Sequence, residues 1–288
     1  MKAPGYFTNK PQFKIIGELR KTLGFYDSIP TTIELVINDY VDKCKIKGVT
    51  PENELNTVAK NFTVKNHNIQ SLDSSRQHIY NFYILSVFNV ADSFFRDLKK
   101  LMIKLNSIQN WKTKSGRKDL DAFNQVIENC KSKDGSTLKS KPEFHLINYY
   151  RLHRNSVVHR VFKKENQFSE SDKYYDKYVL PNVNYHKTTY NLDAPNKSDS
   201  INLHDFLIYT RAIKYYNNLI NDACYNLTES NLVDFALSDE ALTKKLKGFD
   251  KASDKKKQKP LKNLLQQYFK LEQCPEFDSF YRNYLMNA

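Results

Sequence analysis

Glycine and proline are scarce in this chain, whose 288 residues include 7 of the first and 9 of the second. Folds with many short strands need these residues at their turns. Their scarcity therefore disfavours a turn-rich sandwich or barrel. Lysine, asparagine, leucine and tyrosine are abundant, and 40% of the residues are hydrophobic, which is enough to fill a core. We predict an all-α fold built from long helices.

Long uninterrupted apolar runs are also missing. The longest mostly apolar run is FYILSVFNVA at residues 82–91, which is too short to span a bilayer. The first residues, MKAPGYFTNKPQFKII, lack the apolar core of a signal peptide. We therefore expect a soluble, cytoplasmic protein with no membrane-spanning segment.

Cysteine is rare, and its copies are far apart in the sequence. The four cysteines are Cys44, Cys130, Cys224 and Cys274. No two of them form a CxxC pair, so neither a zinc site nor a disulfide framework is indicated. Three of the histidines also lack the spacing of metal ligands: His145, His186 and His204. We expect reduced structural thiols and no metal or other cofactor.

Acidic residues are outnumbered by basic ones, 32 to 45, which gives a formal charge of +13. Clustered lysine and arginine side chains attract phosphates and release the counterions condensed on them. The charge therefore favours a polyanionic partner. Nucleic acid is the first candidate and an anionic membrane surface the second.

Apolar residues recur at helical spacing in most of the chain, with turn-like stretches between them. The region 181–200 is polar and is predicted as a loop. The lysine-rich region 243–259 is interpreted as a solvated linker, with an RNA or membrane contact as the alternative. Helices are predicted over 29–44, 50–62, 73–105, 119–130, 142–162, 203–226 and 260–286.

The stretch RLHRNSVVHR, at residues 151–160, lies inside one of these predicted helices. Arg154 occupies a position on the apolar stripe of that helix where a hydrophobic residue is expected. Burying its charge without a partner is costly. Asp92 lies on the flank of the apolar stripe of the predicted helix 73–105. We therefore predict a supporting salt bridge between Asp92 and Arg154.

Arg154, Asn155 and His159 resemble the R-x4-6-H motif of the HEPN superfamily, in which a polar residue commonly follows the arginine. The segment 83–102 looks like an early helix of that family, with an acidic residue before an aromatic pair. The segment 200–222 looks like the helix that closes the bundle. The resemblance implies a HEPN-like helical bundle over 71–228, with helical extensions at 1–70 and 229–288.

The resemblance also implies a metal-independent endoribonuclease. His159 would move a proton to or from the RNA 2′-hydroxyl, because its pKa lies near neutrality. Arg154 would hold the phosphate and stabilise charge in the transition state, while Asn155 would orient the phosphate or His159. Arg151 and Arg160 are interpreted as solvated or RNA-binding residues.

One feature of the motif favours two chains at the site. At 100° per residue, Asn155 and His159 share a helix face, but Arg154 and His159 are about 140° apart. HEPN nucleases usually dimerise so that two motif helices line one cleft, which implies a homodimer. We place the free face at Tyr149, Leu152, Asn155 and His159.

Two functions remain open from the sequence. By analogy with the family, the protein would be a toxin or an abortive-infection effector against phage, with an antitoxin or regulatory protein as a possible partner. Alternatively, it would be a non-catalytic basic helical module that binds nucleic acid or a partner protein. Cleavage of RNA separates the two.

Overall fold

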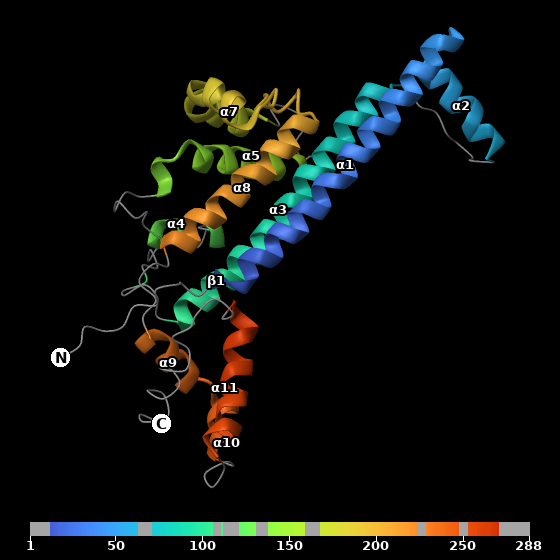
Figure 1. The fold of residues 1–288 in the computed structure, drawn as a ribbon. Coiled ribbons are helices and arrows are strands. Elements are labelled where there is room, and N and C mark those ends of the chain that lie inside the picture. The colour runs from blue at the N-terminus through green and yellow to red at the C-terminus, as the bar shows by residue number, and fades with distance from the viewer. Residues whose placement is uncertain are drawn as a thin grey trace. The chain divides into compact units, whose positions relative to one another are not determined.

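The computed structural model describes residues 12–62, 71–105, 111, 121–130, 138–158, 168–223, 229–247 and 253–270. These residues are almost all helical, and the prediction of an all-α fold is confirmed (Figure 1). The helices of five or more residues are α1 (Lys14–Lys47), α2 (Pro51–Asn61), α3 (Leu72–Lys104), α4 (Ala122–Asn129), α5 (Pro142–Val158), α6 (Ser169–Tyr174), the π-helix η3 (Tyr175–Val179), α7 (Val183–Tyr190), α8 (Leu203–Ala223), α9 (Glu229–Leu237), α10 (Glu240–Lys247) and α11 (Asp254–Tyr268).

Three short elements complete the described fold. Two are the 3-10 turns η1 (Leu138–Ser140) and η4 (Leu180–Asn182). The third is a pair of two-residue strands, in which β1 (Gln12–Phe13) runs antiparallel to β2 (Phe269–Lys270). This pairing joins residues from distant parts of the sequence.

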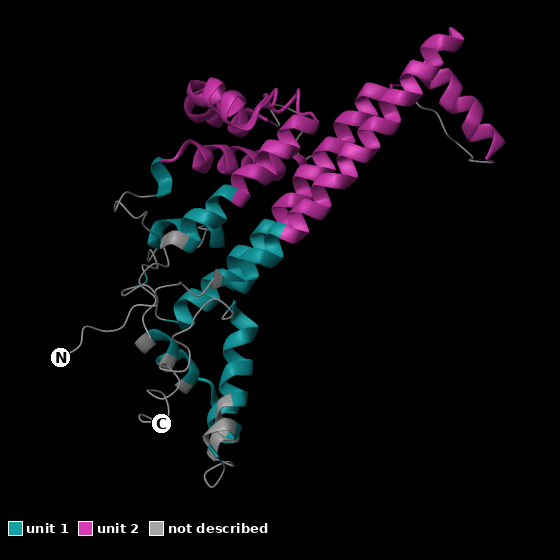
Figure 2. Ribbon diagram, viewed as in Figure 1, with its two compact units in different colours: residues 1–20, 91–140, 215–288 teal, residues 21–90, 141–214 magenta. Residues whose placement is uncertain are grey.

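The chain divides into two compact units, coloured separately in Figure 2. Unit 1 comprises residues 1–20, 91–140 and 215–288, and unit 2 comprises 21–90 and 141–214. Three helices, α1, α3 and α8, begin in one unit and end in the other. The division into 1–70, 71–228 and 229–288 that the sequence suggests is a different one, and it stays a prediction.

In unit 2, α1 and α3 lie side by side (Figure 1). The guanidinium of Arg76 donates to the Asn38 side chain at 2.5 Å and pairs with Glu34 at 3.5 Å, and the Tyr80 hydroxyl also donates to Glu34. The helix expected over 29–44 begins much earlier than predicted, at Lys14. Pro30, near the start of the predicted range, lies inside α1.

Hydroxyl groups support the turn of α1 around Pro30. Thr31 donates to the carbonyl of Asp27 at 2.9 Å, and Thr32 donates to that of Ser28 at 2.8 Å. A proline removes one backbone donor from a helix. The hydroxyl groups add hydrogen bonds to the carbonyls of Asp27 and Ser28 in this turn, and α1 continues through Pro30.

The predictions for α2 and α3 are confirmed. The Thr50 side chain caps α2 by accepting a hydrogen bond from the backbone N–H of Asn53 at 3.3 Å, and Pro51 occupies the first helical position. The helix α3 spans almost the whole predicted range of 73–105, and Ile84, Val87 and Leu98 on it are fully buried.

The predicted loop at 181–200 is wrong for its first half, because 183–190 form α7. β-branched residues such as Val183 and Thr188 lower intrinsic helix propensity, yet α7 buries His186 completely. Burial therefore outweighs propensity here. The helix ends at Asn191, whose φ of 50° is left-handed. The lysine-rich region 243–259 is likewise not only a linker, since parts of it belong to α10 and α11.

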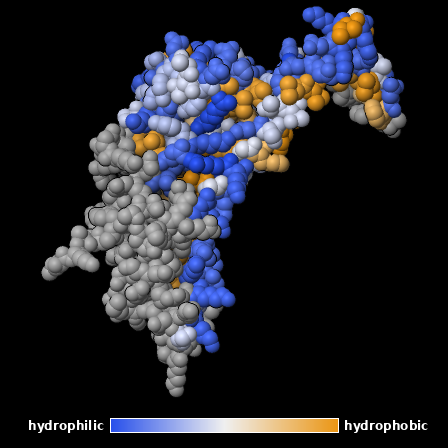
Figure 3. Space-filling model, viewed as in Figure 1, coloured by the Kyte–Doolittle hydropathy of each residue, from blue (hydrophilic) through white to orange (hydrophobic). Residues whose placement is uncertain are grey.

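The structure bears on the predictions for the cysteines and for membrane-spanning segments. Cys44 and Cys130 are buried free thiols, as predicted, while Cys224 and Cys274 lie outside the described residues. Within the described part of the chain, no helix combines the length and apolar character needed to cross a bilayer. Hydrophobic side chains do reach the surface of α1 and α2 (Figure 3), including Phe25, Leu35 and Phe62.

Candidate functional site

The helix α5 carries the described part of the RNSVVH motif, and it is more deeply buried than its sequence suggests. Tyr149, Tyr150 and His153 are all inaccessible to solvent. The sequence predicts Tyr149 on a free face, and this is wrong, because its hydroxyl donates to the backbone carbonyl of Asn196 at 2.7 Å. The exposed part of α5 is therefore confined to its last turns, where Val158 is exposed.

Arg154 lies in these last turns and is half-buried. Its guanidinium carbon is 4.6 Å from the centre of the Phe88 ring on α3, which is a cation–π contact. Its Nη1 donates to the Asn155 side chain at 3.1 Å, and its Nε is buried with no hydrogen-bond partner among the residues that the structure describes. Both contacts orient the guanidinium, and neither neutralises its charge.

The other motif residues are placed only in part. Asn155 is half-buried and accepts from Arg154. His159 and Arg160 follow directly after α5 and lie outside the described residues. Arg151 is half-buried one turn before Asn155, and its Nε donates to the Asn148 side chain at 3.2 Å. The structure thus brings Arg154 and Asn155 together, and the place of His159 beside them stays a prediction.

Asp92 has a near partner on its own helix. Its carboxylate accepts from Arg96 at 2.7 Å, with Arg96 one turn further along α3. Asp92 belongs to unit 1 and Arg154 to unit 2. The salt bridge between Asp92 and Arg154 therefore also stays a prediction.

His153 is a buried residue of α5 to which the sequence assigns no role. Its ring stacks on Phe168 at 5.3 Å, and its Nε2 lies 2.9 Å from the Oδ1 of Asn81 on α3. Because this oxygen can only accept, Nε2 carries the proton and donates it. The other nitrogen, Nδ1, is buried with no partner among the described residues. Protonating Nδ1 would place a positive charge away from water, so burial lowers the pKa of His153 to about 4.

This pKa predicts a loss of stability in acid. His153 has a lower pKa when folded, so the unfolded chain binds more protons between pH 6.5 and about 4. Stability is therefore present above pH 6.5 and falls as the pH drops toward 4. The full loss in the free energy of unfolding that comes from His153 is up to roughly 3 kcal/mol. His186, whose pKa burial also lowers to about 4, adds to it.

The variant His153→Gln tests this prediction, because a glutamine amide can donate to Asn81 but does not titrate. Urea denaturation of both proteins at several pH values between 7 and 4.5 gives the free energy of unfolding. We expect a shallower fall with pH in the variant. Parallel curves for the two proteins would show that His153 does not contribute.

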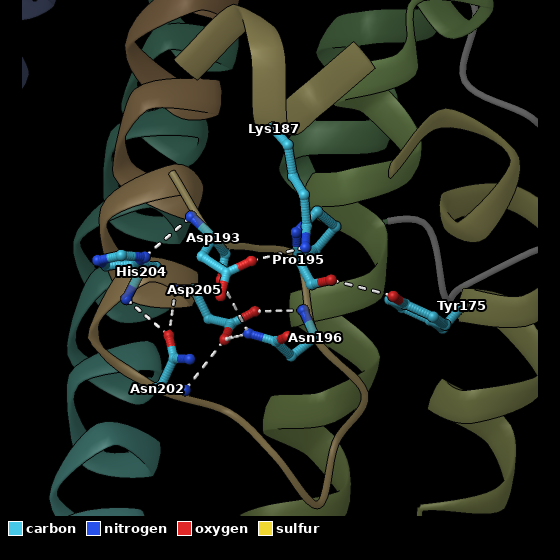
Figure 4. Close-up of polar contacts among 8 residues, drawn as sticks. All are labelled: Tyr175, Lys187, Asp193, Pro195, Asn196, Asn202, His204 and Asp205. Atoms are coloured by element: carbon cyan, nitrogen blue, oxygen red, sulfur yellow. Dashed lines mark hydrogen bonds and ion pairs between the residues drawn. The ribbon is translucent and has the colours of Figure 1, made fainter. Parts of the chain in front are cut away.

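A buried carboxylate, Asp205 at the start of α8, anchors α5 to the loop that precedes α8. Asp205 is fully buried, and its Oδ1 accepts from the Tyr150 hydroxyl and the Asn196 backbone, both at 2.8 Å. Its Oδ2 accepts from the Asn196 side chain at 2.8 Å and the Asn202 backbone at 3.0 Å. Figure 4 shows the Asn196 and Asn202 groups converging on Asp205. Burial raises the pKa of Asp205, and these hydrogen bonds oppose the shift.

Further contacts fix the same loop. The Tyr175 hydroxyl donates to the carbonyl of Pro195 at 3.0 Å, and the backbone N–H of Asp193 donates to the Nδ1 of His204 at 2.9 Å (Figure 4). These bonds tie the loop to η3 and α8, and the Tyr149 bond ties it to α5. The part of α5 before its last turns is therefore hydrogen-bonded to a loop that is itself fixed by several contacts.

The start of α5 holds a second set of polar groups. The Glu143 carboxylate is buried and accepts from the hydroxyls of Tyr185 and Tyr190, at 2.8 and 3.1 Å. His145 stacks on Tyr178, and burial lowers the pKa of His145. Among the residues that the structure describes, no three His, Cys, Asp or Glu side chains gather in a way that could hold a metal ion.

Comparisons of the chain with models of protein families, with curated proteins and with solved structures give no match. The fold itself defines an all-α protein, and its helix α5 carries a basic motif with a half-buried arginine, Arg154. The contacts of Arg154 are the basis of the proposed function.

Proposed function

We propose that the protein is a metal-independent endoribonuclease of the HEPN type. The proposal rests on the contacts and the charge of Arg154. Its guanidinium is held by Phe88 and Asn155, and its positive charge is not cancelled by either contact. A cation fixed in this way is suited to an RNA phosphate, because a preorganised charge stabilises a transition state without further reorganisation.

The proposed reaction needs a proton acceptor, a proton donor and a charge stabiliser. The ribose 2′-oxygen attacks the neighbouring phosphorus and loses its proton to a base. The bond from phosphorus to the 5′-oxygen breaks, and that oxygen gains a proton. His159 would serve as one of these acid–base groups, while Arg154 and Asn155 hold the phosphate. The products are a 2′,3′-cyclic phosphate and a 5′-hydroxyl.

A homodimer supplies the second acid–base group in this proposal. Each chain has one motif, and a two-fold axis would place two copies of His159 at one cleft. The net charge of +13 supports RNA as the substrate. We propose that the protein acts as a cytoplasmic toxin or anti-phage effector, with an antitoxin or regulatory protein as its partner.

Cleavage in the presence of a chelator tests the proposal. Purified protein is incubated with a mixed RNA substrate in excess EDTA, and the product ends are mapped. We expect cleavage to persist and to leave 2′,3′-cyclic phosphate or 3′-phosphate ends, because side chains carry out the proton transfers. RNA methylated at every 2′-oxygen is the control and should resist, since it lacks the nucleophile.

Two results would contradict the proposal in different ways. Activity that EDTA removes and Mg²⁺ restores would indicate a metal-dependent nuclease. Binding of intact RNA without any cleavage would favour the non-catalytic basic module.

A further inference from the structure

A pocket of about 300 Å³ opens in unit 1, at the first turns of α1. Its apolar lining comes from Phe13 and Ile16, both buried. Its polar lining comes from Arg20 on α1, from Asn218 and Asn221 on α8, and from Lys270 on β2. All of these residues belong to unit 1. The volume lies at the small end of the range for ligand pockets.

The side chains of the two cations in this pocket have no acidic partner among the described residues. Within that part of the chain, neither the Arg20 guanidinium nor the Lys270 ammonium forms an ion pair or a hydrogen bond. Lys104 in the same unit, by contrast, pairs with Asp239 at 3.6 Å. Arg20 and Lys270 are both exposed, so water screens their charges, and an anion bound between them would interact favourably with both.

The two amides add hydrogen-bonding groups to the charges. Asn218 and Asn221 are three residues apart on α8, so they share a helix face. Neither side-chain amide makes a hydrogen bond to another described residue. Each amide offers two N–H donors. The pocket therefore combines two cations with unoccupied donors, a set that matches the several acceptor oxygens of a phosphate.

Gly17 explains how the Lys270 ammonium reaches the pocket. The pairing of β1 with β2 sets Lys270 opposite Gln12, at the start of α1. A Cβ atom on Gly17 would lie only 3.2 Å from the Lys270 Nζ. The bare backbone of Gly17 thus leaves room for the ammonium close to α1. A glycine here lowers helix stability relative to alanine, and the close approach of Lys270 gives it a physical reason.

We propose that this pocket binds the phosphate of a small phosphorylated molecule. The pocket is too small for a large ligand to be enclosed, so a phosphomonoester or diphosphate group is the part that it recognises. The proposal does not rest on RNA cleavage by α5, because it uses none of the motif residues. It assigns to unit 1 a ligand site of its own.

Titration with inorganic pyrophosphate, followed by calorimetry on the full-length protein, tests the site. We expect Arg20→Gln and Lys270→Gln each to weaken binding about tenfold or more, the scale of a charge-assisted hydrogen bond. Lys14→Gln is the matched control, because Lys14 is an exposed lysine of the same helix terminus outside the pocket. It should bind pyrophosphate as the wild type does.

Gly17→Ala separates binding from folding. The added Cβ should displace the Lys270 ammonium and weaken pyrophosphate binding, while the Tm is unchanged or rises because alanine favours the helix. A drop in both binding and Tm would indicate damage to the fold, and the two charge variants then decide. Equal binding by wild type, Arg20→Gln and Lys270→Gln would overturn the proposal.

A short RNA oligonucleotide distinguishes the source of the phosphate. If the wild type binds no pyrophosphate, and Arg20→Gln and Lys270→Gln weaken RNA binding instead, the pocket is part of an RNA contact and the small-ligand proposal fails. RNA cleavage measured on the same variants should be unchanged. If these variants lost both RNA cleavage and pyrophosphate binding, the pocket would be part of the proposed nuclease and not a separate site.

Discussion

Replacing His159 with alanine is expected to lower RNA cleavage by about 100-fold or more, which is the usual scale for losing a general acid–base group. Arg154→Ala is expected to have an effect of similar size, because it removes the charge that stabilises the phosphorane-like transition state. Arg154→Lys keeps the charge but loses the planar contact with Phe88, so an intermediate loss is expected.

Two controls make these changes informative. Arg151→Ala should mainly weaken RNA binding, which appears as a higher KM with kcat retained. His78→Ala removes an exposed histidine of α3 and should leave cleavage unchanged. Thermal denaturation of each variant shows whether it is folded. Near-normal cleavage by a folded His159→Ala protein would instead support a basic binding module.

Replacing Asp205 with alanine is expected to lower the free energy of unfolding by roughly 3 kcal/mol or more. The change removes one buried acceptor group that serves four donors, from Tyr150, Asn202 and two groups of Asn196. The Tyr150 hydroxyl would remain buried without this acceptor, while the half-buried groups of Asn196 and Asn202 would lose their bonds to it. Because Tyr150 belongs to α5, the loss should also loosen the helix that carries Arg154.

Urea denaturation followed by circular dichroism measures this loss. Asp199→Ala, an exposed aspartate in the same loop, is the matched control and should change stability little. Asp205→Asn should fall between the two, because it keeps one acceptor oxygen and sets a new amide against the donors. A loss in Asp205→Ala no larger than in Asp199→Ala would show that the network does not anchor the loop.

The sequence predicts the regular parts of this fold well, because helical spacing and capping are local signals. The long helix α3, the Thr50 cap of α2 and most of α8 follow from it. The start of α1 lies well before the predicted range 29–44, at Lys14. The helix α7 was missed because its stability comes from burial and not from propensity.

The candidate site could be predicted only where its chemistry is local. The sequence places Arg154 and Asn155 side by side in one motif, but the hydrogen bond between their side chains is a finding of the structure. The support of the site is not local. His153 meets Asn81 across 72 residues, and Tyr150 meets Asp205 across 55. A single sequence has no signal for which polar residues pair over such separations, so these anchors required the structure.

The pairing of β1 with β2 has a consequence for protein synthesis. Phe13 and Lys270 are far apart in the sequence, yet both line the same pocket. A ribosome releases the chain in order, at about 5–20 residues per second. The α5 residues therefore emerge well before Lys270 does. A translation product that stops between them can carry the arginine motif without Lys270, so the complete lining of the pocket forms only after translation has passed Lys270.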